Sequence, residues 1–221
     1  RLGTPVRRLL PQGSRVVRLP LGIGRGINLD LDLRDGGYLS LYMGLYEVEL
    51  NRHLRSLCRP GMRGFDLGGS IGYDALVMAN HTKAPVLTVE ADPDLCARLM
   101  GNVAANPPLA RLVTVTQGFI DSSSDVQGHV TVDQLAERYF LPDVLKIDIE
   151  GGEVSALLGA SRVLEAKRPE MIIEVHSEEL EDECREILMG YDYVIKIVNQ
   201  RRVLPDYRPA LHNRWLVATT P

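Results

Sequence analysis

A glycine-rich turn near residue 68 constrains the fold more than any other part of this sequence. The short, mainly apolar stretch 64–67 runs into Gly68-Gly69-Ser70-Ile71-Gly72, and a second apolar stretch at 86–90 follows after the length of one helix. Glycine has no Cβ, so such a turn lets the backbone approach a ligand closely. An acidic residue about 20 positions on, here Glu90, suits a ribose diol. The pattern predicts a site for a nucleoside-bearing cofactor.

From residue 63 onward, strand and helix patterns alternate. Strands are predicted at 63–67, 85–90, 111–117, 144–149 and 170–175, and helices near 72–81, 93–105, 131–140, 154–164 and 178–190. This alternation indicates βαβ units around a parallel sheet that is covered on both faces. Two final strands, at 193–198 and 215–219, have no helix pattern between them, so we expect them to pair antiparallel.

Residues 1–60 have a different pattern, and we expect them to form an extension ahead of a main domain at 61–221. Residues 27–33 alternate between apolar and polar, which is typical of a half-buried strand. Asp35-Gly36-Gly37 indicates a turn. Apolar residues between 45 and 57 then recur at roughly helical spacing. The expected extension is a hairpin followed by a helix.

Composition excludes several classes of protein. A net charge of -4 argues against a general nucleic-acid binder, which needs a basic face. No apolar run approaches the roughly 20 residues that span a bilayer. The cysteines Cys58, Cys96 and Cys184 are far apart and form no CxxC motif, so neither a disulfide framework nor a zinc–cysteine site is expected. A reducing, cytoplasmic location fits this pattern.

The spacing of the glycines distinguishes between two classes of cofactor. A dinucleotide fingerprint reads G-x-G-x-x-G, whereas the glycines here stand at 68, 69 and 72, with Asp66 just before them. A carboxylate beside the turn repels a pyrophosphate and favours a cationic group, such as the sulfonium of S-adenosylmethionine. The turn therefore favours this methyl donor, and an NAD-dependent oxidoreductase is the alternative.

Longer motifs resemble known methyltransferases. The segments 65–73 and 89–93 resemble the class I S-adenosylmethionine-dependent methyltransferases. Five further segments resemble the FkbM family within that class, namely 44–47, 131–135, 142–153, 158–160 and 173–176. The resemblance covers most of residues 42–176. It implies a Rossmann-like class I α/β fold with a seven-stranded, mostly parallel sheet and an antiparallel C-terminal strand. The N-terminal hairpin and helix would cap the cofactor site.

The same resemblance implies which residues hold S-adenosylmethionine. The glycine turn would lie near the methionine part, Glu90 would take the ribose hydroxyls, and Asp148 would face the methionine amino group or the acceptor. Gly118 and Phe119 would lie near the adenine, with a plain core or lid residue as the alternative for Phe119. The complete expected set is Glu47, Asp66, Gly68, Gly69, Ser70, Gly72, Glu90, Ala91, Gly118, Phe119 and Asp148.

Candidate residues for chemistry on the acceptor stand at the ends of two strands. Residues two apart share a face of a strand, so Lys146, Asp148 and Glu150 line up. Glu174 and His176 do so on the next strand. Both strands end at the carboxyl edge of the sheet, where open α/β sheets bind ligands. His176 titrates near neutral pH, and we expect it to act as a base or to orient the acceptor. A purely structural histidine is the alternative.

These side chains have two further candidate roles. A buried Lys146 needs a partner, for which Glu174 is expected, and a catalytic role for Lys146 is the alternative. Asp148, Glu150, Glu174 and His176 are also ligand types for a hard metal ion. No dedicated ligand spacing is present, so no metal ligand is assigned and a divalent metal is not favoured.

The sequence thus predicts an enzyme that moves a methyl group from S-adenosylmethionine, with Asp148, Glu150 and His176 on the acceptor side. The resemblance implies O-methylation of a hydroxyl on a small molecule, sugar or glycolipid. The expected partner is this small-molecule or glycan acceptor, with no nucleic acid and no membrane span. A non-catalytic module that keeps the fold and binds the cofactor is a further alternative.

Overall fold

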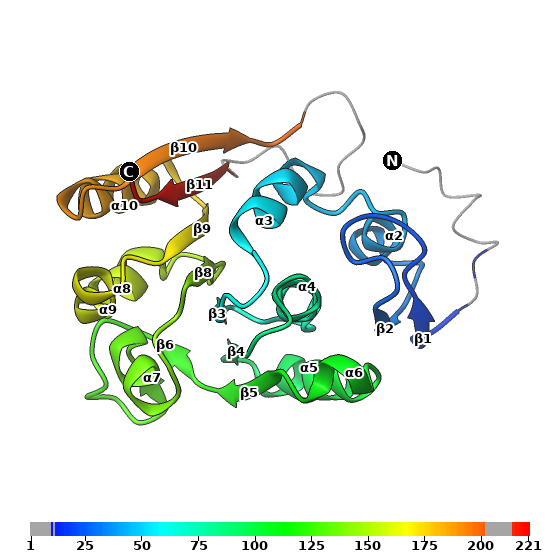
Figure 1. The fold of residues 1–221 in the computed structure, drawn as a ribbon. Helices are drawn as coiled ribbons and strands as arrows, with labels where there is room; N and C mark the ends of the chain where they lie inside the picture. Colours follow the sequence, from blue (N-terminus) through cyan, green and yellow to red (C-terminus); the bar gives the residue numbers. More distant parts are fainter. Residues whose placement is uncertain (1–9, 11, 202–213) are drawn as a thin grey trace.

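The computed structural model describes residues 10, 12–201 and 214–221, and a seven-stranded sheet lies at its centre (Figure 1). The strands lie in the order β10-β11-β9-β8-β3-β4-β5. Their bounds are β3 Gly64–Leu67, β4 Val86–Glu90, β5 Val113–Gln117, β8 Val144–Ile147, β9 Glu170–Val175, β10 Val194–Asn199 and β11 Arg214–Thr219.

The pairing of the strands confirms the predicted mixed sheet. β3 pairs in parallel with both β4 and β8, while β5 and β9 extend the parallel part on either side. β11 lies between β9 and β10 and is antiparallel to both. The last two strands therefore pair antiparallel as expected, and the connection at 202–213 lies outside the described residues. Every parallel strand ends at the same edge of the sheet.

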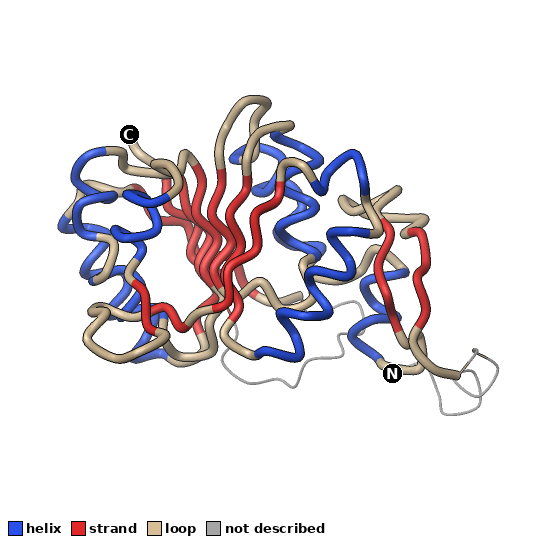
Figure 2. The backbone as a smooth tube through the Cα atoms, turned by 90° about the horizontal axis from the view of Figure 1, so that it is seen from below, coloured by secondary structure: helices blue, strands red, loops and turns tan. Residues whose placement is uncertain are grey.

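Helices cover both faces of the sheet (Figure 2). One face is covered by α3 Asn51–Leu57, α4 Tyr73–Thr82 and α5 Pro93–Ala104, followed by the short α6 Pro107–Ala110. The other is covered by α7 Val132–Arg138, α8 Glu153–Leu158, α9 Ser161–Ala166 and α10 Glu178–Gly190. Each face has its own apolar core, one containing Leu76 and Trp215, the other Phe65 and Leu157. No helix in the described part of the chain is long and apolar enough to cross a bilayer.

Local signals explain where several helices begin. Asp92 caps α5 by accepting from two backbone N–H groups, and Pro93 occupies the first helical position. Thr131 and Gln134 form a capping box at α7, and Ser177 caps α10 at the predicted boundary.

The single helix predicted at 154–164 is two helices, α8 and α9. Gly159 follows α8, and a Cβ at this position would collide with the carbonyl of Asp121. The chain therefore packs backbone against backbone here, which only glycine permits.

The N-terminal extension is a hairpin and helices, with one difference from the prediction. β1 Arg15–Arg18 pairs antiparallel with β2 Asn28–Leu31. Asp35 does not mark a simple turn but caps α2 Gly36–Tyr42, because its carboxylate accepts from the N–H groups of Gly37 and Tyr38. A 3₁₀ turn, η1 Val48–Leu50, then leads into α3. In addition, two-residue strands not predicted from the sequence, β6 Phe119–Ile120 and β7 His129–Val130, pair beside the sheet.

Two buried asparagines on α5 tie the hairpin to the main sheet. The side-chain oxygen of Asn102 accepts from Asp30 N (2.7 Å), and its amide donates to the carbonyl of Ile71 in the glycine turn (2.8 Å). Asn106 exchanges two hydrogen bonds with the backbone of Asn28. The exposed backbone edge of β2 is thereby satisfied by side chains instead of by another strand.

We predict that Asn102→Ala lowers the free energy of unfolding by about 1–3 kcal/mol, because it removes the hydrogen-bond partner of the part-buried Asp30 N–H and of the buried Ile71 carbonyl. Urea denaturation measures this. Asn80→Ala is the matched control, since that amide only accepts from the exposed Lys83, and we expect a change within about 0.5 kcal/mol. Equal effects of the two substitutions would contradict the role given to Asn102.

Candidate functional site

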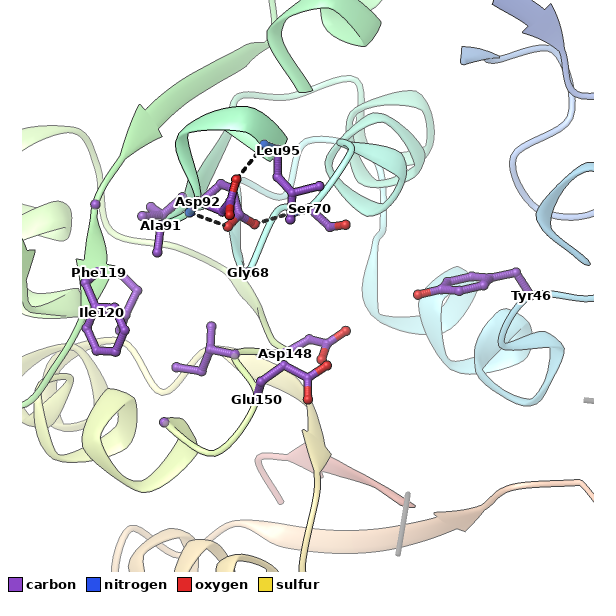
Figure 3. Close-up of a pocket in the computed structure, with 15 residues that line it drawn as sticks. Tyr46, Gly68, Ser70, Ala91, Asp92, Leu95, Phe119, Ile120, Asp148 and Glu150 are labelled. Atoms are coloured by element: carbon purple, nitrogen blue, oxygen red, sulfur yellow. Dashed lines mark hydrogen bonds between the residues drawn. The ribbon is translucent and has the colours of Figure 1, made fainter. Parts of the chain in front are cut away.

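A cavity of about 370 Å³ opens at the carboxyl edge of the sheet, around the ends of β3, β4 and β8 (Figure 3). Ligands of open α/β sheets bind at this edge. Gly68 lies between Phe119 on one side and Tyr46 on the other. The lining residues are Tyr46, Gly68, Ser70, Val89, Glu90, Ala91, Asp92, Leu95, Gly118, Phe119, Ile120, Asp148, Ile149, Glu150 and Gly152.

The glycine turn forms the floor of this cavity. Gly68 has φ +89°, a left-handed conformation, and a Cβ here would collide with the carbonyl of Asp148 at the end of β8. The N–H groups of Gly68 and Gly69 both donate to the carbonyl of Val89 (2.9 Å each). The ends of β3, β4 and β8 are thus brought together by backbone contacts, and this part of the cavity is lined by main chain instead of bulky side chains.

Glu90 links the turn to the next strand. One carboxylate oxygen accepts from Ser70 N (2.6 Å) and the other from Asp92 N (2.9 Å). Ser70 has φ +46°, an unfavourable conformation for a residue with a Cβ, and the bond from its N–H to Glu90 helps to hold it. Each carboxylate oxygen can accept a second hydrogen bond, so Glu90 can also receive a pair of ligand hydroxyls.

Apolar side chains line the end of the cavity near Phe119. Phe119 is 50% exposed, which rules out a plain core residue, while the alternative of a lid stays a prediction. Its ring is 4.7 Å from that of His129, centroid to centroid. Together with Ile120, this ring offers a surface on which a flat aromatic ligand can stack.

A second hollow of about 230 Å³ adjoins the first on the side of α2. Tyr46, Gly68, Ser70 and Asp148 line both hollows, which together form one groove. Tyr38, Tyr73 and Asp74 are among the other residues that line the second hollow. The N-terminal extension thus contributes part of the wall of the site.

Lys146 lies buried beneath this groove. Its ammonium contacts Asp74 Oδ2 (3.1 Å) and Asp148 Oδ2 (3.2 Å), so the expected pairing with Glu174 is wrong. In the sheet Lys146 stands opposite Ile172, two residues before Glu174, and Glu174 accepts instead from the indole N–H of Trp215 (3.0 Å). Burial lowers the pKa of Lys146, but the surrounding carboxylates outweigh this and raise it well above its usual value. Lys146 therefore stays charged and holds Asp148 in place.

Two of the expected cofactor contacts are buried carboxyls outside the main cavity. Asp66 is completely buried and accepts from the Thr88 hydroxyl (3.0 Å), and burial raises its pKa to about 7. Glu47 has φ +40°, and burial, together with Glu174, raises its pKa well above the ordinary value. Neither residue lines the 370 Å³ cavity, so any influence on a bound ligand is electrostatic.

His176 lies just behind the edge of the cavity. Its Nδ1 is 2.7 Å from Glu153 Oε1, while its Nε2 is 3.7 Å from Asp148 Oδ1 and 3.6 Å from Glu150 Oε2. The hydrogen bond to Glu153 raises the pKa of His176 to about 9, against the opposing effect of burial. The imidazole is therefore protonated at neutral pH in the absence of ligand.

The structure brings together many of the predicted residues but not all. Eight of them line the main cavity: Gly68, Ser70, Glu90, Ala91, Gly118, Phe119, Asp148 and Glu150. Gly69 lines only the second hollow, and Gly72 lies at the start of α4 and lines neither. Sequence reasoning did not assign Tyr46, Asp92, Leu95, Ile120 or Ile149 to the site. Most of these residues are adjacent in sequence to predicted site residues, and this adjacency is the signal that could have identified them.

Three side chains near the cavity are of the types that bind a metal ion. Asp148, Glu174 and His176 each offer one ligand atom, and these atoms lie within 4.8 Å of one another. However, Asp148 already neutralises Lys146, and Glu174 accepts from Trp215. The expectation that a divalent metal is possible but not favoured stays a prediction.

Comparison with known proteins identifies the family. Residues 66–195, more than half of the chain, match the model of the methyltransferase FkbM domain. The hexuronic acid methyltransferase AglP of Haloferax volcanii is 28% identical over 137 residues. That match covers 51% of this chain and 55% of AglP, so the chain spans about half the length of this curated relative.

Solved structures share the fold at low sequence identity. The methyltransferase FkbM of Methylobacillus flagellatus KT has a TM-score of 0.60 and 22% identity, covering 85% of this chain and 55% of that one. A SAM-dependent O-methyltransferase of Thermotoga maritima has a TM-score of 0.58 and 14% identity, covering 100% and 97%. Aeropyrum pernix fibrillarin, which contains natively bound S-adenosyl-L-methionine, has a TM-score of 0.54 and 18% identity, covering 74% and 68%.

We predict that Gly68→Ala destabilises the protein more than Gly61→Ala, as measured by urea denaturation. Both glycines have left-handed φ angles, +89° and +87°, where alanine costs about 1–2 kcal/mol. At Gly61 the new Cβ meets nothing within 4 Å, whereas at Gly68 it meets the Asp148 carbonyl. We expect this collision to cost about a further 1–3 kcal/mol. An equal loss at both positions would mean that β3 and β8 can separate freely.

Proposed function

Because the chain belongs to the FkbM family of methyltransferases, we propose that it transfers the methyl group of S-adenosylmethionine to a hydroxyl of a small molecule, sugar or glycolipid. The observation that carries the choice of a nucleoside-bearing donor is the Glu90 carboxylate, and the acidic lining of the cavity favours S-adenosylmethionine among such donors. The Glu90 carboxylate borders the cavity directly beside the glycine turn and can accept two further hydrogen bonds. A ribose diol matches this arrangement.

The rest of the cavity fits the donor in shape and in charge. Its 370 Å³ lies within the range of pockets for ligands of this size, about 300–1,000 Å³. The exposed ring of Phe119 suits the adenine. Among the described lining residues, Glu90, Asp92, Asp148 and Glu150 are acidic and none is Lys or Arg. This favours a ligand with a sulfonium and an amino group over a pyrophosphate.

When bound, S-adenosylmethionine supplies a methyl group on a positively charged sulfur and leaves as S-adenosylhomocysteine. The protein aligns the acceptor with this group and excludes water. Asp148 and Glu150 project into the space between Gly68 and Tyr46, so we place the acceptor hydroxyl there (Figure 3). His176 stands directly behind both carboxylates and is our candidate for the group that takes up the hydroxyl proton.

Two observations support a hydroxyl-rich acceptor. The second hollow combines tyrosine rings with carboxylates, a lining that suits the faces and hydroxyls of a sugar ring. In addition, the relative AglP is described as a hexuronic acid methyltransferase. We propose that residues 1–60 form a cap over the main domain at 61–221, supported by the position of Tyr46 in both hollows. The cytoplasm is the proposed compartment, supported by the three free, buried cysteines.

Titration of the protein with S-adenosylmethionine and with NADH, followed by calorimetry, tests the donor. We expect saturable binding of S-adenosylmethionine and none of NADH. Glu90→Gln should weaken the binding at least tenfold, because hydrogen bonds to a charged group contribute about 1.5–3 kcal/mol. Asp94→Asn is the control, since this exposed carboxylate stands nearby in the first turn of α5 but lines neither hollow. The absence of S-adenosylmethionine binding would overturn the proposal.

A panel of alcohols and sugars with isotope-labelled donor then separates an enzyme from a non-catalytic module. Methyl transfer to any member of the panel establishes catalysis. Donor binding without transfer to extracts or to the panel would favour the module of the same fold. Transfer of hydride instead of methyl would favour the oxidoreductase alternative.

We further predict that turnover is unaffected by dialysis against EDTA, because Lys146 already supplies the positive charge beside Asp148. Turnover is measured before and after dialysis, and again after Mg²⁺ is added. A loss that Mg²⁺ restores would show that a metal ion is required, and Asp148, Glu174 and His176 would then be the ligands to examine.

A further inference from the structure

Glu153 has no assigned role, yet it is a completely buried carboxyl group beside the acceptor side of the site. It is the first residue of α8 and has no exposed surface. Its Oε1 accepts from the N–H of Gly151 (3.1 Å) and contacts His176 Nδ1 (2.7 Å). Its Oε2 is buried without a hydrogen-bond partner in the described structure. Burial of a charged group is costly, so this position carries a physical penalty that needs a reason.

The contact with Glu153 determines which nitrogen of His176 faces the site. A carboxylate can only accept, so Nδ1 must carry a proton. Nε2 is then directed at Asp148 and Glu150, both of which line the cavity. A ring turned the other way would present Nδ1 to the groove and lose a short hydrogen bond to a buried acid. The orientation of the imidazole is therefore set by Glu153 from behind.

We propose that Glu153 is a positioning residue for methyl transfer, which holds His176 so that Nε2 can receive the proton of the acceptor hydroxyl. This inference rests on the proposed function. In the step it serves, the acceptor oxygen forms a bond to the methyl carbon, and the carbon–sulfur bond breaks with its electrons going to sulfur. The hydroxyl proton passes to Nε2, which must be unprotonated when the step begins.

The charges around the ring give the pH dependence a direction. The His176 ring is faced by Glu153 from α8 and by Asp148 and Glu150 from the end of β8. Glu174 faces it from β9, the strand that His176 follows. All four are carboxyls, and the Glu153 contact is the largest cause of the raised pKa of His176, about 9. The imidazole is thus charged below this pH and neutral above it. Turnover is expected to rise with pH towards about 9.

The test compares the wild-type protein with Glu153→Gln, which keeps the size and an acceptor oxygen but removes the charge. NMR titration of histidine-labelled protein follows His176, whose signal is identified by its loss in His176→Ala. We expect the pKa of His176 to fall by at least one unit in Glu153→Gln. The ascending limb of kcat against pH should move to lower pH by the same amount. At the wild-type optimum kcat should fall at least tenfold, with the Kd for S-adenosylmethionine changing less than threefold.

Asp121→Asn is the matched control. Asp121 Oδ2 contacts His129 Nδ1 at 2.8 Å, the same kind of bond, away from the Asp148 and Glu150 carboxylates. Removing this charge should leave the pH profile where it is. In the His176→Ala background, which should itself bind donor normally and transfer slowly, Glu153→Gln should cause no further loss of turnover.

An unchanged His176 titration in Glu153→Gln overturns the proposal, as does a shifted titration with an unshifted pH profile. A further loss in the His176→Ala background would show a purely structural role for Glu153. If the protein binds donor but methylates nothing, the NMR titration still decides whether Glu153 controls His176. Failure of donor binding would instead overturn the proposed function and leave the His176 titration to be judged separately.

Discussion

The site depends on the backbone contact between Gly68 and the carbonyl of Asp148. No side chain at position 68 separates the ends of β3 and β8, so the two strands that lead to the glycine turn and to Asp148 end side by side. The same turn is attached to β4 through the Val89 carbonyl and the Glu90 carboxylate. One missing Cβ therefore allows the glycine turn and the carboxylates of Glu90 and Asp148 to border a single cavity.

The fold could be predicted from the sequence to a large extent, because local signals and apolar patterning agree. Ser177 at the start of α10 and Asp92-Pro93 at the start of α5 mark those helices without any tertiary information. The break between α8 and α9 could not be predicted in this way. It follows from the packing of Gly159 against the distant backbone of Asp121. The prediction of a simple turn at Asp35 is wrong because N-caps and turns favour the same residue types.

The site was predictable where its residues follow strand ends, and less so where contacts cross the sheet. Glu90 and Asp148 lie at the predicted edge, since parallel strands bring their ends together. The predicted pairing of Lys146 with Glu174 is wrong because the strand register sets Lys146 opposite Ile172. Single-sequence patterns do not specify this register. Asp74, its actual partner, comes from the first turn of α4, and Glu153 reaches His176 from α8. Such contacts between sheet and helix depend on packing, not on spacing along the chain.

Asn102 has a consequence that extends beyond stability. Through one side chain, it joins the carbonyl of Ile71 in the glycine turn to the N–H of Asp30 in the N-terminal hairpin. A displacement of the hairpin is therefore transmitted to the glycine turn through Asn102. Substitutions around β2 would thus change the shape of the cavity from a position that does not line it.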